Sequence, residues 1–403
     1  MSRYLGASPG FVVAVDLPPG PAWLDVMSEL WAEGAAILPL DRRLTDRDRR
    51  AIVDLARPAS VVTANDEVLF ADSEPLDPER AGLVIATSGT AGKLKLVELS
   101  RAAVSAAVGS SFLALQTTSP PMALEPSEPW ICCLSPAHMG GMVVLLRHLV
   151  FDTPVSVHEG FDVEAFARGR IPQNVHVSLV PTMLRRLVDA VDDLSHLGVL
   201  LVGGGGLDPE LGRRAAERGG HAVSTYGLTE TSGGIAYDGR LFDGTRARIG
   251  AGEELELHGP TLMEGYRLDP AATASAFTLD GWLRTGDVGA IEDTGRLRID
   301  GRLDDAIRTG AETVWPQRLE TALADHPKVA DVAVAGRPDP EWGAQVVAFV
   351  VPEAAEDPPT LQELRDHALE RLPRFMAPRA LVLMTNLPRT DSGKLRRGSL
   401  PSR

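Results

Sequence analysis

Apolar and polar positions alternate in blocks through the first half of the chain, and the blocks predict strands followed by helices. Short apolar runs with the length of buried strands lie at 11–15, 61–64, 155–159, 175–180 and 198–204. Between them, segments such as 101–115 and 182–194 place apolar residues at the spacing of one helix face. This repeated order of strand and helix predicts an α/β fold with mostly parallel sheets flanked by helices.

The pattern changes after residue 234. Short β-rich pieces separated by turns follow at 255–260 and 281–302, and they predict a smaller β-rich subdomain. After residue 302 come segments typical of two helices and two strands, and then a polar tail, which together predict a small α+β domain. We therefore expect a large N-terminal domain at 1–302 and a small C-terminal domain at 303–403.

The composition is that of a globular protein with an excess of acidic residues. The 403 residues include 40 Lys and Arg against 55 Asp and Glu, for a net charge of −15, and 44% are hydrophobic. Such a chain repels nucleic acid, so an anionic ligand needs a local site. The N-terminus lacks the apolar core of a signal peptide, and no uninterrupted apolar run is long enough to span a bilayer. These features predict a cytoplasmic protein without a nucleic-acid partner or membrane insertion.

The two cysteines, Cys132 and Cys133, are adjacent in an apolar run. They lack the C-x-x-C spacing that is typical of redox and metal sites. We interpret them as small buried hydrophobic residues of a reduced protein.

One stretch, Leu83 to Leu99, has the composition of a phosphate-binding loop. Its apolar start ends at small, hydroxylic and glycine residues followed by lysines, namely Thr87, Ser88, Gly89, Thr90, Gly92, Lys93 and Lys95. Glycines let backbone N–H groups approach an anion, and hydroxyls and lysines add donors and charge. The stretch is not a Walker A loop, because Leu94 stands where Ser or Thr would follow the lysine. Taken alone, it is also compatible with an ordinary surface turn.

Four further segments follow in order along the chain. They read YGLTE at 226–230, GWLRTGDVG at 281–289, GRLDDAIRTGAETVWPQRLE at 301–320 and LPRTDSGK at 387–394. With these segments and the loop before them, the chain resembles the adenylate-forming superfamily of acyl- and aryl-CoA synthetases, adenylation domains and luciferases. The resemblance covers nearly the whole chain. It implies a small, mobile C-terminal domain that rotates between two half-reactions.

The resemblance also implies the chemistry. A carboxylate attacks the α-phosphate of ATP and releases pyrophosphate, and a thiol such as that of coenzyme A (CoA) then displaces AMP. Both steps build negative charge, so positioned donors and cations should supply most of the catalysis. The implied catalytic residues are Lys394, Glu230 and Thr90, and the latter two would also position Mg²⁺, a cation that prefers oxygen ligands.

The implied ATP-binding residues lie in several of these segments. They are Thr87, Ser88, Gly89, Thr90, Gly92, Lys95, Gly204, Gly205, Tyr226, Gly227, Thr229, Asp287 and Arg302. By resemblance, Tyr226 would stack on adenine, Asp287 would accept hydrogen bonds from the ribose hydroxyls, and Arg302 would assist. Lys394 would reach the reacting carboxylate and the α-phosphate. Taken singly, acidic and basic residues such as these are also compatible with solvated surface side chains.

The C-terminal segments carry two further implied roles. Asp304 matches the hinge about which the small domain rotates, and Gly310 and Ala311 match a glycine pair near the pantetheine channel of CoA. This chain departs from the family pattern at Ala91, Leu94, Leu96 and Ala311, where the family usually has Thr, Pro, Gly and Gly. These departures leave ATP affinity and CoA access open.

Within the superfamily, residues 135–149 (SPAHMGGMVVLLRHL) and 226–239 (YGLTETSGGIAYDG) resemble the o-succinylbenzoate–CoA ligase family of menaquinone biosynthesis, in its short actinobacterial form. The implied substrate is an aromatic ring with two carboxylates. Its site needs apolar walls and a cation or donors for the carboxylate that does not react. The candidate acid-binding residues are His138, Arg147, Ser232, Gly233 and Gly234. The glycines would leave room for the ring, and Arg147 would pair with the distal carboxylate.

Two other functions remain open at this stage. One is a ligase for another aryl acid in specialised metabolism, with CoA or a separate carrier protein as the acceptor. The other is a non-catalytic nucleotide-binding relative, although such a protein would have no need of Lys394. The sequence does not fix the oligomeric state.

Overall fold

The computed structural model describes residues 3–88, 94–118, 125–310, 312–389 and 395–401. The chain forms two compact units. The first comprises Met1–Leu207, Leu211–Ala247 and Glu256–Arg284, and the second comprises Asp208–Glu210, Arg248–Leu255 and Thr285–Arg403. The boundary expected after residue 302 lies inside the second unit, and it stays a prediction.

The first unit contains a seven-stranded sheet with the order β16-β6-β5-β2-β1-β3-β4. Its strands are β1 (Val12–Asp16), β2 (Ala36–Pro39), β3 (Ser60–Thr63), β4 (Glu67–Leu69), β5 (Ala81–Ser88), β6 (Leu94–Ser100) and β16 (Gly265–Tyr266). The central strands are parallel, whereas β5 and β6 form an antiparallel hairpin and β16 pairs antiparallel with β6. The hairpin therefore sits between the parallel core and a strand from much later in the chain.

Alternation along β1 explains how two helices cover this sheet. Val13 and Val15 pack in the same core as helix α1 (Ala22–Ala32), while Val12 and Ala14 pack in the core that contains residues of α2 (Asp46–Ala56). Successive side chains of a strand point to opposite faces of the sheet. Because β1 is apolar on both faces, a helix must pack against each of them. Thr45 is the N-cap of α2, and its hydroxyl accepts a hydrogen bond from the backbone N–H of Asp48.

A second seven-stranded sheet has the order β13-β12-β11-β10-β9-β7-β8. Its strands are β7 (Trp130–Cys132), β8 (Val155–Val157), β9 (His176–Leu179), β10 (Val199–Val202), β11 (His221–Leu228), β12 (Gly233–Tyr237) and β13 (Arg240–Leu241). Strands β7 to β11 run parallel, and β12 and β13 turn back antiparallel. Helices α5 (Val163–Ala167), α6 (Pro181–Ala190) and α7 (Pro209–Glu217) share a core with one face of this sheet.

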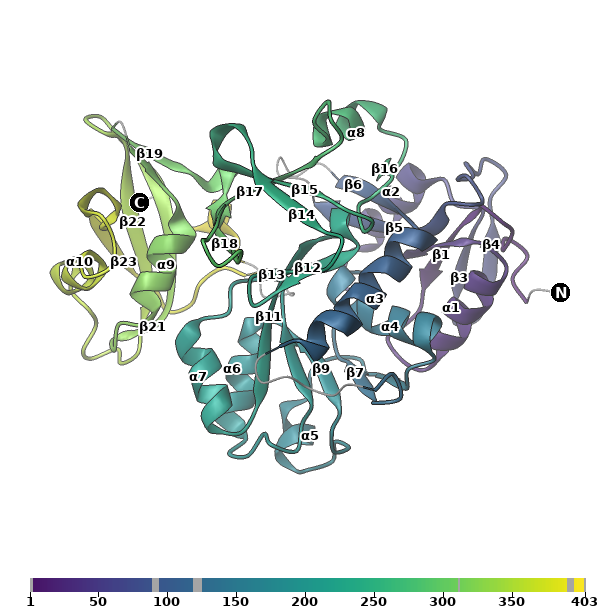
Figure 1. The fold of residues 1–403 in the computed structure, drawn as a ribbon, viewed down its shortest axis with the longest axis horizontal. Helices are drawn as coiled ribbons and strands as arrows, with labels where there is room; N and C mark the ends of the chain where they lie inside the picture. The colour runs from purple at the N-terminus through teal and green to yellow at the C-terminus, as the bar shows by residue number, and fades with distance from the viewer. Residues whose placement is uncertain (1–2, 89–93, 119–124, 311, 390–394, 402–403) are drawn as a thin grey trace. The chain divides into compact units, whose positions relative to one another are not determined.

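Helices α3 (Arg101–Gln116) and α4 (Met139–Phe151) lie side by side in the largest core, which also takes residues from both seven-stranded sheets (Figure 1). Helix α4 carries apolar residues on nearly every side and is largely buried. A helix that is apolar all round belongs in the interior. The single buried arginine of α4, Arg147, is therefore enclosed by packed side chains.

The remaining strands form smaller sheets. A four-stranded sheet has the order β14-β15-β17-β18, with β14 (Arg246–Ile249), β15 (Glu254–His258), β17 (Leu283–Ile291) and β18 (Leu297–Arg302). Strands β19 (Ile307–Thr309) and β20 (Glu312–Val314) form a hairpin, and β21 (Val329–Asp339), β22 (Gly343–Pro352) and β23 (Ala380–Leu383) form a three-stranded sheet. Helices α9 (Pro316–Ala324) and α10 (Leu361–Leu369) pack on the latter, and α8 (Pro270–Ala276) contacts β16.

The predicted fold class is confirmed: mostly parallel sheets with helices on both faces are followed by β-rich and α+β parts. Within the described ranges, no helix combines the length and apolar character needed to cross a bilayer.

Candidate functional site

The predicted phosphate loop joins two paired strands. Thr87 near the end of β5 pairs with Lys95 near the start of β6, so these two residues flank the loop. Ser88 is the last residue of β5. The loop residues Gly89, Thr90 and Gly92 lie outside the described residues, and their phosphate-binding role stays a prediction.

Glu230 lies in a short 3-10 turn, Thr229–Thr231, directly after β11. The backbone N–H of Met263 donates to the carbonyl of Glu230 over 2.8 Å, and the hydroxyl of Ser232 donates to the carbonyl of Thr261 over 2.9 Å. The turn is therefore tied to the segment that leads into β16. Since β16 pairs with β6, these contacts bring Glu230 to the strand that follows the phosphate loop.

Tyr266, in β16, connects Glu230 with Lys95. Its hydroxyl donates to Oε1 of Glu230 over 2.9 Å, and the ammonium of Lys95 lies 4.3 Å from the centre of its ring. Sequence reasoning missed Tyr266, because its position depends on pairing between strands that are far apart in the chain. The GYR triplet at 265–267 gave no local sign of this role.

The chemistry of Glu230 is compatible with a cation site shared with a ligand. In the described part of the chain, no group of three or more His, Cys, Asp or Glu side chains is placed to hold a metal ion. Glu230 instead offers one half-buried carboxylate near the loop. Mg²⁺ keeps few protein ligands and takes the rest from phosphate oxygens and water, so the residues present fit Mg²⁺ bound with a nucleotide.

The predicted adenine-binding residues come from two neighbouring strands. Gly204 and Gly205 follow β10, and Tyr226 lies on β11, which pairs in parallel with β10. A Cβ on Gly203 would stand 2.6 Å from the Thr225 methyl group, so the glycine turn lies against β11. The structure thus brings the glycine turn to the same sheet edge as Tyr226, with Thr229 just beyond β11.

The predicted ribose-binding pair is in contact in the second unit. Asp287 on β17 and Arg302 on β18 are register partners, and Nη1 of Arg302 donates to Oδ1 of Asp287 over 2.8 Å. Gly286 lies in the left-handed region at φ 67°, and a Cβ there would stand 2.9 Å from Nη2 of Arg302. The glycine therefore leaves the space that the guanidinium needs beside the buried Asp287 carboxylate.

Two further predicted residues lie in or near the small sheets. Asp304 is exposed in a 3-10 turn, Leu303–Asp305, directly after β18. Gly310 follows β19 at φ 64°, with its N–H donating to the carbonyl of Trp342. Ala311 and Lys394 lie outside the described residues. The hinge, CoA and catalytic roles of these positions stay predictions.

His138, the N-cap of α4, is held by an acidic partner from the first sheet. Its Nε2 lies 3.1 Å from Oδ2 of Asp41, just after β2. Nε and Nη2 of Arg43 also donate to the Asp41 carboxylate, over 2.9 Å and 2.7 Å. Burial alone would raise the pKa of Asp41, but the hydrogen bonds from His138 and Arg43 hold it well below its usual range. Sequence reasoning found His138 but missed Asp41.

The Ser232–Gly234 segment serves close packing in this structure. A Cβ on Gly233 would stand 2.8 Å from a methyl group of Val143 in α4, and one on Gly234 would stand 2.5 Å from Oγ1 of Thr225. Gly233 also lies at φ 103°, which favours glycine. These residues let β12 approach α4, and their role beside a substrate ring stays a prediction.

Among the predicted site residues that the structure describes, Arg147 is the most deeply buried one with a charged side chain, with 2% of its surface exposed. Its Nη2 donates to the Ser111 hydroxyl over 2.7 Å, and the guanidinium lies 4.1 Å from the centre of the Trp130 ring. The Ser111 hydroxyl in turn lies 2.5 Å from that of Tyr237. Burial lowers the pKa of Arg147 and raises that of the Tyr237 phenol, so this phenol does not become a counter-ion.

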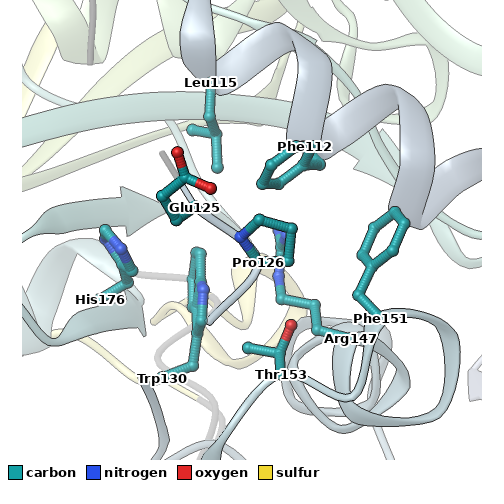
Figure 2. Close-up of a pocket in the computed structure, with 9 residues that line it drawn as sticks. All are labelled: Phe112, Leu115, Glu125, Pro126, Trp130, Arg147, Phe151, Thr153 and His176. Atoms are coloured by element: carbon teal, nitrogen blue, oxygen red, sulfur yellow. The ribbon is translucent and has the colours of Figure 1, made fainter. Parts of the chain in front are cut away.

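Figure 2 shows Arg147 in a pocket with mainly apolar and aromatic walls. The pocket is lined by Phe112, Leu115, Glu125, Pro126, Trp130, Arg147, Phe151, Thr153 and His176. Nε of Arg147 is buried without a hydrogen-bond partner, and among the described residues no carboxylate forms an ion pair with this guanidinium. A buried charge is costly without an opposite charge, and among the described residues Arg147 is compensated by the Ser111 hydroxyl and the Trp130 ring. The cavity measures about 10 Å³, room for about one water molecule, so an anionic group of a ligand would reach the guanidinium only if neighbouring side chains moved.

Comparison with known proteins identifies the family. A family model for AMP-binding enzymes matches residues 64–266, and the model for the C-terminal domain of these enzymes matches residues 318–394. A probable 2-succinylbenzoate–CoA ligase of Mycobacterium tuberculosis is 36% identical over 386 residues, covering 92% of this chain and 95% of that protein. This chain belongs to the AMP-binding, adenylate-forming enzyme family.

Solved structures of AMP-binding enzymes share the fold. O-succinylbenzoate CoA synthetase from Bacillus subtilis, in complex with its acyl-adenylate intermediate, has a TM-score of 0.83 at 24% identity, covering 98% of this chain and 88% of that one. The same enzyme in complex with ATP and a magnesium ion has a TM-score of 0.82 at 23% identity, covering 98% and 90%. These structures show the fold, and the family models together with the M. tuberculosis relative confirm the predicted superfamily.

Proposed function

We propose that this protein is an ATP-dependent ligase that joins an aromatic dicarboxylic acid to CoA through an acyl-adenylate, and that the acid is o-succinylbenzoate. Membership of the AMP-binding family and the name of the M. tuberculosis relative support the reaction and the acid. The observation that carries the substrate class is the buried guanidinium of Arg147, which has no carboxylate partner among the described residues.

The proposed nucleotide site draws on the residues of the family's motifs in this chain. The ammonium of Lys95, on the strand after the phosphate loop, would bind the phosphates. Tyr226 and the glycine turn would contact adenine. The carboxylate of Asp287, which is held by a hydrogen bond from Arg302, would accept hydrogen bonds from the ribose hydroxyls. Glu230 and phosphate oxygens would hold Mg²⁺, which would neutralise charge on the departing pyrophosphate. Lys394 would stabilise the charge on the reacting carboxylate and the α-phosphate.

The two carboxylates of the acid are assigned to two residues of α4, one at its N-cap and one inside the helix. His138 and Arg147 are nine residues apart on this helix, a span of roughly 13–14 Å at 1.5 Å per residue. We place the carboxylate that reacts toward His138 and the other toward Arg147, where a charge-assisted hydrogen bond would compensate the buried guanidinium.

The test compares a dicarboxylic acid with a monocarboxylic one. Arg147→Leu should lower kcat/KM for o-succinylbenzoate relative to benzoate by roughly 10- to 150-fold, the loss expected for one hydrogen bond between charged groups. Arg147→Lys keeps the positive charge but loses the planar guanidinium that can bind a carboxylate with two hydrogen bonds. Its preference for the dicarboxylic acid should therefore lie between that of the wild type and that of Arg147→Leu. Pyrophosphate release gives the rates.

Arg101→Leu is the matched control. The Arg101 guanidinium also stacks on a tryptophan, 4.2 Å from the ring centre of Trp31, but it donates to backbone carbonyls of Ala81 and Ala35. This change should leave the ratio of the two acids unaltered. An unaltered ratio in Arg147→Leu as well would overturn the assignment of Arg147 to the distal carboxylate.

A further inference from the structure

We infer that Tyr266 is a positioning residue that holds both the Glu230 carboxylate and the Lys95 ammonium in place for a bound magnesium nucleotide. The inference rests on the proposed function, since it concerns the same nucleotide site. The proposed function assigns no role to the Tyr266 side chain, and the inference adds one. Tyr266 contacts the carboxylate through its hydroxyl and the ammonium through the face of its ring.

The backbone of Tyr266 is fixed from one side by the sheet. Tyr266 is the register partner of Val97 in β6, two residues beyond Lys95. The next residue, Arg267, is buried, and its guanidinium donates to the backbone carbonyl of Ala56 and to Oε1 of Glu98. These bonds anchor β16 to the edge of the first sheet.

Helix α8 fixes Tyr266 from the other side. The N–H of Tyr266 donates to the Thr273 hydroxyl over 2.8 Å. A Cβ on Gly265 would stand 2.7 Å from the Thr273 methyl group, so this close approach needs glycine. The phenol of Tyr266 therefore projects from a rigid support, which is what an orienting group requires.

The two contacts act on different charges. A hydrogen bond from the phenol to Oε1 restricts the Glu230 carboxylate and leaves Oε2 available to a cation. The ring face attracts the Lys95 ammonium, an interaction that grows stronger as water is excluded. Loss of the hydroxyl alone should therefore weaken the cation site, and loss of the ring should also weaken binding of the phosphates.

Two variants separate these effects. Tyr266→Phe keeps the ring and removes the hydroxyl, so Mn²⁺ should bind about tenfold more weakly in the presence of a non-hydrolysable ATP analogue. Binding of the same analogue without a divalent cation should be unchanged. Tyr266→Leu should weaken both. Electron paramagnetic resonance titration of free Mn²⁺ and calorimetry of the analogue give the two constants without turnover.

Tyr4→Phe, which removes the hydroxyl of a buried tyrosine outside the site, is the control and should change neither constant. Thermal unfolding of each variant shows whether it is folded. If Tyr266→Phe binds Mn²⁺ like the wild type, the inference is wrong. If the wild type itself binds the analogue but shows no acid-dependent pyrophosphate release, the proposed function fails and the role of Tyr266 in cation binding is still judged by the titration.

Discussion

At the scale of single residues, the contact between Asp41 and His138 gives the clearest dependence on pH. The pKa of Asp41 in the folded protein lies below its ordinary value, although burial opposes this, because His138 and Arg43 donate to the carboxylate. A carboxyl with a lowered folded pKa stabilises the protein above its unfolded pKa, about 3.9, and this contribution is lost as the pH falls toward the folded pKa.

We therefore expect Asp41→Asn to lower the free energy of unfolding by about 2 kcal/mol at pH 7, the scale of a hydrogen bond between charged groups. The difference from the wild type should shrink below about pH 4. Urea unfolding at pH 7, 5 and 3.5 measures it. Asp54→Asn, at an exposed position of α2, is the control and should show a small difference that does not depend on pH. A constant penalty for Asp41→Asn down to pH 3.5 would contradict the account.

The adjacent cysteines should be unreactive in the folded protein. Both are buried, and burial raises the pKa of Cys133 to about 12 and that of Cys132 still further. Since the thiolate is the reactive form, a disulfide reagent at pH 8 should label neither thiol on the timescale of minutes, and both after unfolding in urea. The absorbance of the chromophore that the reagent releases gives the number of labelled thiols per protein molecule. Rapid labelling of the native protein would show that these residues are not buried as described.

At the scale of elements, Gly227 tests the fit between β11 and β12. A Cβ at this position would stand 1.9 Å from the carbonyl oxygen of Gly233, a backbone atom that cannot rotate away. Gly227→Ala should therefore cost more than about 3 kcal/mol of unfolding free energy, at the upper end for a point change. Chemical denaturation followed by circular dichroism measures it.

Gly109→Ala is the matched control. Gly109 lies within α3, where an added Cβ meets nothing within 4 Å. This change should stabilise the protein by about 0.5–1 kcal/mol, because alanine favours the helix. A similar cost for the two substitutions would argue against the close approach of β11 and β12.

The elements themselves followed from hydrophobic periodicity. The apolar run at 198–204 is observed as β10, and the helix expected at 101–115 is observed as Arg101–Gln116. The hairpin of β5 and β6 and the pairing of β16 with β6 did not follow, because neighbours in a sheet depend on long-range packing. Tyr266 and Asp41 escaped prediction for this reason: each meets its partner only after distant segments pair.

At the scale of the whole molecule, Lys394 tests the expected division of labour between two half-reactions. This residue lies outside the described part of the chain, and its role comes from the LPRTDSGK motif. Lys394→Ala should reduce acyl-adenylate formation by at least about 100-fold, the scale of a lost electrostatic contact in the transition state. Thioester formation from supplied acyl-adenylate should persist.

Rapid-quench assays of each half-reaction measure the two rates. The control is Arg396→Ala, which removes an exposed positive charge two residues away and should leave both rates unchanged. An equal loss of both half-reactions in Lys394→Ala would refute its assignment to adenylation.

The most direct test of the proposed function measures release of pyrophosphate and AMP with ATP and Mg²⁺ across a panel of acids, each with and without CoA. The panel contains o-succinylbenzoate, benzoate, salicylate, anthranilate and a medium-chain fatty acid. We expect sustained AMP production only with o-succinylbenzoate and CoA together. Turnover of another acid that ignores CoA would contradict this account, and would instead indicate a ligase that serves a carrier protein.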